Sequence, residues 1–291
     1  MPLPLSERNP TLHAEAVTAF ERAQTASGNI SQDIADVALS TVDMAAIIAA
    51  RTKEAKEAGG LGGQEGLEVI ANLETREAFE RSFSEFTSLF ERIGFTTPTP
   101  EEFASANPDI LAHWSGVYER MQDNGLEPDV SIAPLADTSE WKALYANLQD
   151  DAAVNDDGRI KDGGLWMNED VEANWTHLTD QTTSDILTAA DGTKWIMQVN
   201  PGIAEAPNVD TVYTDTDIQM SPHAYLATQA RRLAHHRPPL DTDGYSWLHG
   251  TFDSGARAPL GRWLRGYGRV RVGWGGVSYR LVLLGSRSPV G

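Results

Sequence analysis

Large apolar residues recur at helical spacing in one segment, and this periodicity constrains the fold more than any other feature of the chain. Phe79, Phe83, Phe86, Phe90 and Ile93 follow one another at intervals of four and three residues. Since residues three and four apart lie on the same face of an α-helix, the spacing predicts an amphipathic helix with one buried face. Such a phenylalanine stripe is typical of a helix-bundle core rather than of a cofactor site.

Helix signals dominate the first 125 residues. Residues 11–57 resemble two Ala- and Glu-rich helices, and the glycine-rich segment 59–66 is a flexible break. Residues 99–102, Thr-Pro-Glu-Glu, combine an N-cap, a proline at the first helical position and a capping-box acid. The helix or helix pair that follows is expected to end at Gly125. We therefore predict a helical domain over residues 1–125, for which the sequence indicates no role.

From residue 126 onward, strand and turn signals replace the helical periodicity. Strands and helices do not alternate in the way that is typical of a parallel sheet. Residues 126–291 therefore predict a second domain that mixes strands and helices, and we predict an α+β fold for the whole chain. The expected elements are strands at 130–135 and 194–199, helices at 139–148 and 221–235, and a C-terminal hairpin that joins strands 269–274 and 277–284 through a turn at Gly275-Gly276.

The net charge of −19 is distributed unevenly along the chain. Residues 222–291 contain ten Arg, no Lys and three Asp, and so carry +7, whereas residues 1–221 carry −26. An asymmetry of this size is typical of proteins that contact nucleic acid or another anionic surface.

Sequence signals for export and membrane attachment are absent. The chain contains no cysteine, which excludes disulfides, thiolate catalysis and lipid attachment through cysteine. Its first residues do not resemble a secretory signal, and no apolar run is long enough to span a bilayer. We therefore expect a cytoplasmic or virion-associated protein that does not act on membranes.

No established catalytic motif occurs in the chain. The HExxH, GxSxG, P-loop and GxGxxG patterns are all missing. His235, His236 and His249 form a histidine cluster without metal-ligand spacing, and acidic pairs such as Asp156-Asp157 do not fit a calcium loop. We expect no enzymatic activity, no metal and no cofactor.

The C-terminal segment, residues 254–291, has an unusual composition. Its 38 residues contain no Glu, Lys, Gln or Met, although these types make up 40 of the first 253 residues. At that frequency roughly six of them should occur. Codons that end in a pyrimidine cannot encode these four residues or Trp, and apart from Trp263 and Trp274 the whole segment fits such codons. This pattern is expected where adenine-directed mutagenesis has diversified asparagine codons.

The segment resembles the variable region of diversity-generating-retroelement target proteins. In that family a C-type-lectin-like domain of the formylglycine-generating-enzyme type displays hypervariable side chains on a fixed backbone. The resemblance implies such a domain over residues 126–291, with its variable region at about 254–291. The residues that match the fixed frame are Arg257, Ala258, Pro259, Gly261, Trp263, Val270, Val272, Trp274, Arg280, Leu284, Gly285, Arg287, Pro289 and Val290.

The same resemblance implies a set of exposed, diversified ligand contacts between the frame residues. Alternation along the strand supports this division, since Val270 and Val272 should lie on one face and Arg269 and Arg271 on the other. The implied ligand-binding residues are Leu260, Arg262, Leu264, Tyr267, Gly268, Arg271, Gly273, Gly275, Gly276, Ser278, Tyr279, Leu281, Val282, Leu283 and Ser286.

Enzymes related to this family depend on residues that the chain lacks. Formylglycine-generating enzymes need cysteines, and related sulfoxide synthases need a histidine-rich metal site on a helical domain, where this chain offers His13 and His113. We therefore expect a receptor-like protein that binds an unknown protein or cell-surface ligand through the C-terminal variable face.

Two other interpretations of the segment stay open. The arginines could form a basic surface that binds nucleic acid or another polyanion, although the segment lacks lysine and resembles no nucleic-acid-binding fold. A frame error could also have produced a meaningless tail, but the preserved glycines, tryptophans and valine alternation disfavour it.

Overall fold

The computed structural model describes residues 66–148, 164–182, 186–203, 208–209, 213, 219–280 and 283–287. Residues 66–291 form one compact unit. Helices occur in it together with two separate β-sheets, which confirms the predicted α+β class. The helices expected within residues 11–57 lie outside the described residues.

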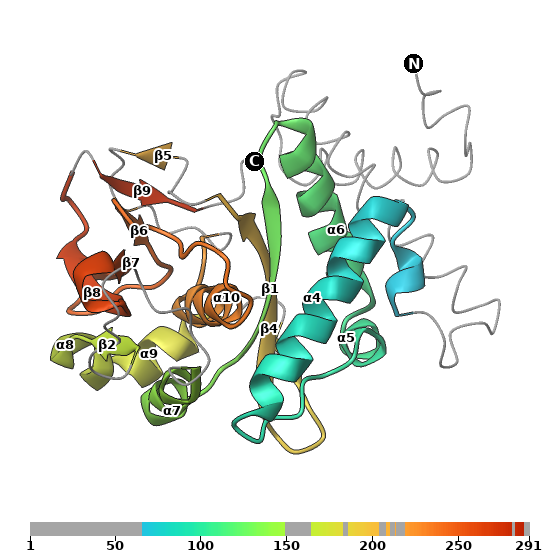
Figure 1. Cartoon of the computed structure of the whole chain (residues 1–291), viewed down its shortest axis with the longest axis horizontal. Helices are drawn as coiled ribbons and strands as arrows, with labels where there is room; N and C mark the ends of the chain where they lie inside the picture. The colour runs from blue at the N-terminus through green and yellow to red at the C-terminus, as the bar shows by residue number, and fades with distance from the viewer. Residues whose placement is uncertain are drawn as a thin grey trace, which may run out of the picture. The chain divides into compact units, whose positions relative to one another are not determined.

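The first sheet is antiparallel, with helices α4 (Leu73–Glu91) and α6 (Pro108–Asp123) against one face and α10 (Pro222–Ala234) against the other (Figure 1). Phe79, Phe83, Phe86 and Phe90 are buried as predicted, and the Phe90 ring meets the Trp195 ring of the sheet at 5.3 Å between centroids. One core therefore continues across residue 125, where we expected a domain boundary. The strands are β1 (Pro128–Pro134), β4 (Lys194–Pro201) and β3 (Ile186–Thr188) in that order, and the further helices are η1 (Leu67–Val69) and α5 (Pro100–Ala106).

Several helix termini follow the sequence signals closely. Thr99 and Glu102 form the predicted capping box at the start of α5. Ser221 caps α10 (Pro222–Ala234) by accepting a hydrogen bond from the backbone N–H of Ala224. Helix α7 (Thr138–Leu148) buries the four large side chains at 141, 144, 145 and 148. Local chemistry thus determines where these helices begin and which face they bury.

Helix α10 lies between the two sheets, and its first ten residues, 222–231, are all buried (Figure 1). Its polar side chains have hydrogen-bond partners, as burial requires. Gln229, for example, donates to the carbonyl of Leu240 and accepts from the Leu240 N–H. Toward the second sheet the helix presents Tyr225, which packs against β7 at Gly261.

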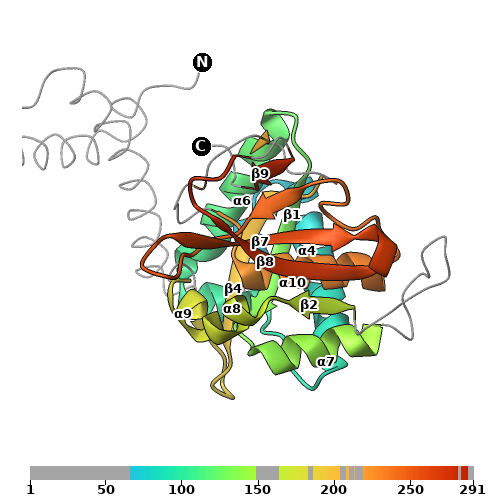
Figure 2. The same ribbon diagram turned by 90° about the vertical axis from the view of Figure 1, so that its left-hand side faces the viewer.

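The second sheet has six strands and mixed direction (Figure 2). Strands β2 and β8 are parallel, as are β6 and β9, whereas the other neighbours are antiparallel. Its order is β2 (Leu165–Met167), β8 (Arg269–Gly276), β7 (Arg257–Leu264), β6 (Tyr245–Trp247), β9 (Leu284–Ser286) and β5 (Asn208–Val209), and short helices α8 (Glu169–Ala173) and α9 (Trp175–Asp180) follow β2.

The sequence prediction of a C-terminal hairpin named the wrong partner for strand β8. Strand β8 pairs along its whole length with β7, which precedes it, through a turn over residues 265–268. Gly268 adopts the left-handed conformation in this turn, at φ +61°. Gly275 and Gly276 lie at the end of β8 itself, and the chain later returns through β9 to lie parallel to β6.

Candidate ligand-binding face

Strands β7 and β8 have one face that belongs to the core of the protein. Trp263, Val270 and Val272 are buried on this inner face, which is directed toward α10. A Cβ atom at Gly261 would come within 2.3 Å of the Tyr225 ring, so the strand and the helix pack too closely there for a side chain at this position. All four residues belong to the frame expected from the sequence.

The opposite, outer face of these strands carries many of the expected ligand contacts. In a strand, successive side chains point to opposite faces, so the residues that alternate with the inner set lie on the outer face. The cross-strand register joins Leu260 to Gly273 and Arg262 to Arg271 on this face. The expected contact residues on the outer face of β7 and β8 are Leu260, Arg262, Leu264, Arg271, Gly273 and Gly275.

Four side chains from four adjacent strands form a row across the outer face, which we call the Arg–aromatic row. It consists of Trp166 on β2, Arg271 on β8, Arg262 on β7 and Tyr245 on β6. The Arg271 guanidinium lies 4.7 Å above the centroid of the Trp166 ring. The Arg262 guanidinium lies 4.3 Å above the Tyr245 ring and donates a hydrogen bond of 2.6 Å to the Tyr245 hydroxyl. Each arginine is therefore held by an aromatic side chain on its outer flank.

The two arginines of the row are positive charges on neighbouring strands. Like charges directly opposite each other on neighbouring strands destabilise a sheet. Among the described residues, no carboxylate pairs with Arg262 or Arg271. Their Nε atoms are buried and have no hydrogen-bond partner in the described part of the chain. The row thus presents two half-buried guanidinium groups that have more N–H donors than there are acceptors around them.

The remaining expected contacts lie at the two ends of β8. Tyr267 is 54% exposed in the turn before the strand. Beyond the strand, Ser278 is exposed, and Tyr279 and Leu283 are 56% and 55% exposed, whereas Ser286 on β9 is half-buried. A strand of eight residues is about 25 Å long, so these exposed side chains form two separate groups. Leu281 and Val282 lie outside the described residues.

Some of the expected contacts are not exposed, which corrects the prediction for them. Leu260 is only 9% exposed, because it packs with Trp247 and Leu284 in a small apolar cluster on the outer face. Gly273 and Gly275 are buried, and a Cβ atom at Gly275 would lie 3.0 Å from the Trp247 ring. The buried Gly268 serves the turn, and Gly276 is half-buried beneath the ring of Tyr279. The part of the outer face around Trp247 is therefore buried and closed to a ligand.

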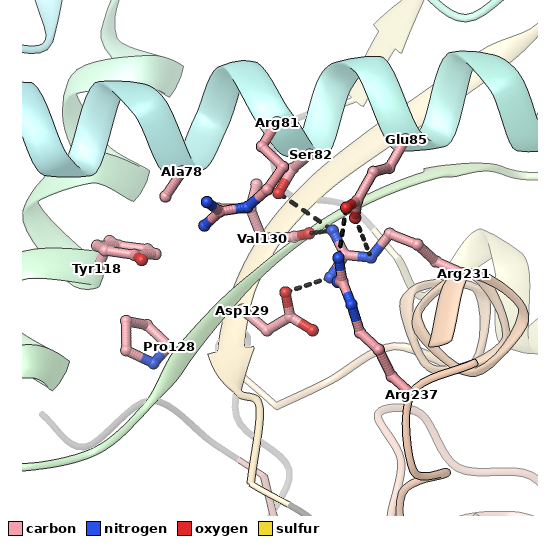
Figure 3. A pocket seen from close by; sticks show the side chains of 10 residues that line it. All are labelled: Ala78, Arg81, Ser82, Glu85, Tyr118, Pro128, Asp129, Val130, Arg231 and Arg237. Atoms are coloured by element: carbon pink, nitrogen blue, oxygen red, sulfur yellow. Dashed lines mark hydrogen bonds and ion pairs between the residues drawn. The ribbon is translucent and has the colours of Figure 1, made fainter. Parts of the chain in front are cut away.

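A second candidate is a small polar cavity of about 50 Å³ between α4, β1 and α10 (Figure 3). Arg231 enters it from α10, donates hydrogen bonds to Ser82 and to the Val130 carbonyl, and forms an ion pair with Asp129. Glu85 approaches Arg231 at 3.7 Å and also pairs with Arg237. Because opposite charges compensate each other in so small a space, the cluster joins three elements of the fold and does not resemble a substrate site.

An open hollow of about 540 Å³ adjoins the Arg–aromatic row at the edge of the second sheet. Trp166 belongs to both, and the hollow is otherwise lined by β2, α8 and Lys142. Lys142 pairs with Glu172 at 2.6 Å and Asp170 pairs with Arg257 at 3.1 Å, while Glu169 adds further negative charge. The hollow is therefore acidic where the row is basic.

The described residues contain neither a candidate metal site nor a candidate membrane span. Within the described ranges, no three His, Asp or Glu side chains gather in a way that could hold a metal ion. His235 and His236 are exposed at the end of α10, while the ring of His249 lies 3.1 Å from the Gln181 carbonyl. No helix in the described part of the chain has the length and apolar character needed to cross a membrane.

Neither a scan against protein-family models nor searches of curated proteins and of solved structures return a match for this chain.

Proposed function

We propose that this chain is a hypervariable, receptor-like ligand-binding protein that displays diversified side chains on a fixed, lectin-like scaffold. The proposed binding surface comprises the open part of the outer face of β7 and β8 and the exposed residues on either side of β8. The proposed role includes no catalytic step. Its ligand would be a protein or cell-surface molecule, met in the cytoplasm or from a virion.

The observation that carries this proposal is the division of β7 and β8 into two faces. Frame residues such as Trp263, Val270 and Val272 point to the core, whereas Arg262 and Arg271 alternate with them on the other face. Diversification needs such a division, because changes on a solvent-facing side leave core packing intact. The alternation in the segment thus supports a scaffold that tolerates variation at chosen positions.

The exposed side chains also have the composition of a binding surface. Tyr267, Tyr279 and Leu283 are large and apolar yet more than half exposed. Tyrosine and arginine supply much of the binding energy at protein interfaces and lose little conformational entropy when they are already held in place. The stacked arginines of the row are held in this way by Trp166 and Tyr245.

A second candidate function is binding of nucleic acid or another polyanion, and Arg262 and Arg271, which have no carboxylate partner among the described residues, favour it. That function predicts an affinity that falls steeply with added salt. The acidic hollow beside Trp166 and the net charge of −19 oppose it, since both repel phosphates along an extended strand.

Sequencing the DNA that surrounds the coding region tests the proposed function. We expect a near-copy of the segment that encodes residues 254–291, differing from it at adenines, beside a reverse-transcriptase gene. A near-copy that differs at random bases, or the absence of any copy, would contradict diversification.

A further inference from the structure

We propose that the Arg–aromatic row is a carboxylate-binding site, and that it receives an Asp or Glu side chain of a protein ligand between Arg262 and Arg271. This inference rests on the proposed ligand-binding role of the outer face and specifies the chemistry that the face recognises in this copy of the protein.

The stacking geometry leaves the hydrogen-bonding edges of the guanidinium groups available. A guanidinium is planar and its N–H bonds lie in that plane, so stacking on a ring occupies the face and not the edge. Arg271 stacks on Trp166 and donates no hydrogen bond to any described residue, and its Nε is buried without a partner. Arg262 donates one hydrogen bond to Tyr245, and its Nε is likewise buried without a partner. The terminal Nη groups of both arginines therefore keep N–H donors with which a ligand carboxylate can form charge-assisted hydrogen bonds.

Arg257 provides an internal comparison, because it forms the same kind of stack with its counter-charges present. Its guanidinium lies 3.9 Å above the Trp274 ring. It also donates to Asp170 at 3.1 Å and pairs with Asp253 at 3.3 Å. The stack of Arg271 on Trp166 repeats this arrangement without the carboxylates. A ligand carboxylate would complete it.

The repulsion between the two arginines points in the same direction. Arg262 and Arg271 are direct cross-strand partners on the same face, an arrangement that costs stability in the free protein. An anion bound between them converts this repulsion into two attractions. Binding of an anion would thus relieve a like-charge pairing that the free protein carries.

The surroundings of the row favour an isolated carboxylate over a chain of phosphates. Leu264 lies on the same strand and face as Arg262, and the Trp166 ring borders the hollow that Glu169 and Asp170 line. A polyphosphate that left the row toward β2 would meet these carboxylates. An acidic side chain on a largely apolar protein surface would instead meet Leu264 and the aromatic rings.

Arginine side-chain NMR on the full chain provides the test. The protein is labelled with ¹⁵N-arginine, and the Nε–Hε signals are followed while an acetylated, amidated hexaglutamate peptide is added. We expect the Arg262 and Arg271 signals to shift and those of Arg257 and Arg287, which already hold carboxylates, to stay in place. A hexaglutamine peptide should shift none of them.

Matched Arg-to-Lys variants assign the effect to the row. Arg262→Lys and Arg271→Lys keep the charge but lose the planar fork, so each should weaken hexaglutamate binding about tenfold. Arg280→Lys, at an exposed position of the same segment, should bind as the wild type does. The buried Arg287 signal reports in each variant whether the fold is intact.

Three results would overturn the proposal. They are unshifted Arg262 and Arg271 signals, Arg271→Lys binding as tightly as the wild type, and an oligothymidylate that shifts the same signals at lower concentration than hexaglutamate. The last result would establish the polyanion alternative. None of these results depends on whether the DNA near-copy exists. The proposed diversification is therefore tested independently of the carboxylate site.

Discussion

The Arg287 guanidinium donates a hydrogen bond of 2.7 Å to the Asp241 carboxylate, and both side chains are completely buried. Arg287 also donates to the Ser246 hydroxyl and to the carbonyls of Pro201 and Ile203. The end of the C-terminal segment is thereby joined to the end of β4 and to β6. Since only arginine presents this many donors in a planar fork, Arg287 serves the scaffold, unlike the arginines of the outer face.

Removing this guanidinium should destabilise the whole unit. Arg287→Met leaves the Asp241 carboxylate buried without its counter-charge, so we expect a loss of about 3–5 kcal/mol in the free energy of unfolding, measured with urea. Arg280→Met is the matched control at an exposed position. Equal unfolding midpoints for the two variants would show that Arg287 is not part of the scaffold.

Much of the fold could be predicted from the sequence because its signals are local. The phenylalanine stripe of α4, the capping box at Thr99 and the Ser221 cap each depend on residues within a few positions of one another. The pairing of β8 was mispredicted because one local signal, the pair Gly275-Gly276, was interpreted as a turn. Gly275 and Gly276 resemble a hairpin turn, but Trp247 and Leu260 fill the space where a side chain at Gly275 would lie, so Gly275 serves packing within the sheet.

Gly261 tests the contact between β7 and α10. A Cβ atom there would lie 2.3 Å from the ring of Tyr225, which is fully buried and cannot move aside. Gly261→Ala should therefore reduce the free energy of unfolding by about 3 kcal/mol. Gly266→Ala, where no atom lies within 4 Å of the added Cβ, should change it by less than about 0.5 kcal/mol. Similar thermal midpoints for both variants would argue against the close approach.

Positions within the expected contact set should differ in their tolerance of substitution. Gly275→Arg places a side chain against Trp247 and Leu260, so we expect a loss of about 1–3 kcal/mol in unfolding free energy. Tyr279→Arg, at a position that is 56% exposed, should cost less than about 0.5 kcal/mol. If both variants unfold at the wild-type urea concentration, the part of the outer face around Trp247 can open, and Gly275 belongs with the variable positions.

His223 should make stability depend on pH. It is fully buried, accepts a hydrogen bond from the Trp141 indole and lies 2.9 Å from the Thr179 hydroxyl, and burial lowers its pKa to about 3. The unfolded chain, with a pKa of about 6.5, binds a proton that the folded chain excludes. This contribution to stability is complete above about pH 6.5 and is lost as the pH falls, by about 3 kcal/mol at about pH 4.

Replacing the imidazole isolates this contribution. The unfolding free energy of His223→Asn should fall less steeply between about pH 6.5 and 4 than that of the wild type, by one proton's slope. His235→Asn, at the exposed end of α10, should leave the wild-type slope unchanged. Parallel curves for the wild type and His223→Asn would mean that His223 is charged in the folded protein.

The candidate site could be predicted only in part. Alternation along β8 predicts that Arg271 and Val272 lie on opposite faces, because it depends on adjacent residues. Trp166 and Tyr245 could not be found, because each lies on a strand of only three residues whose pairing is remote in sequence. The burial of Leu260 was missed for the same reason, since its cover, Trp247, comes from the neighbouring strand β6.

The central claim is that one face of β7 and β8 varies while the other is fixed. Its most direct test is deep sequencing of the DNA for residues 254–291 across a population that carries this chain. We predict that codons for Arg262, Arg271 and Tyr279 differ between copies, while those for Val270 and Val272 do not. Substitutions distributed equally over the two faces, or a segment identical in all copies, would contradict the account.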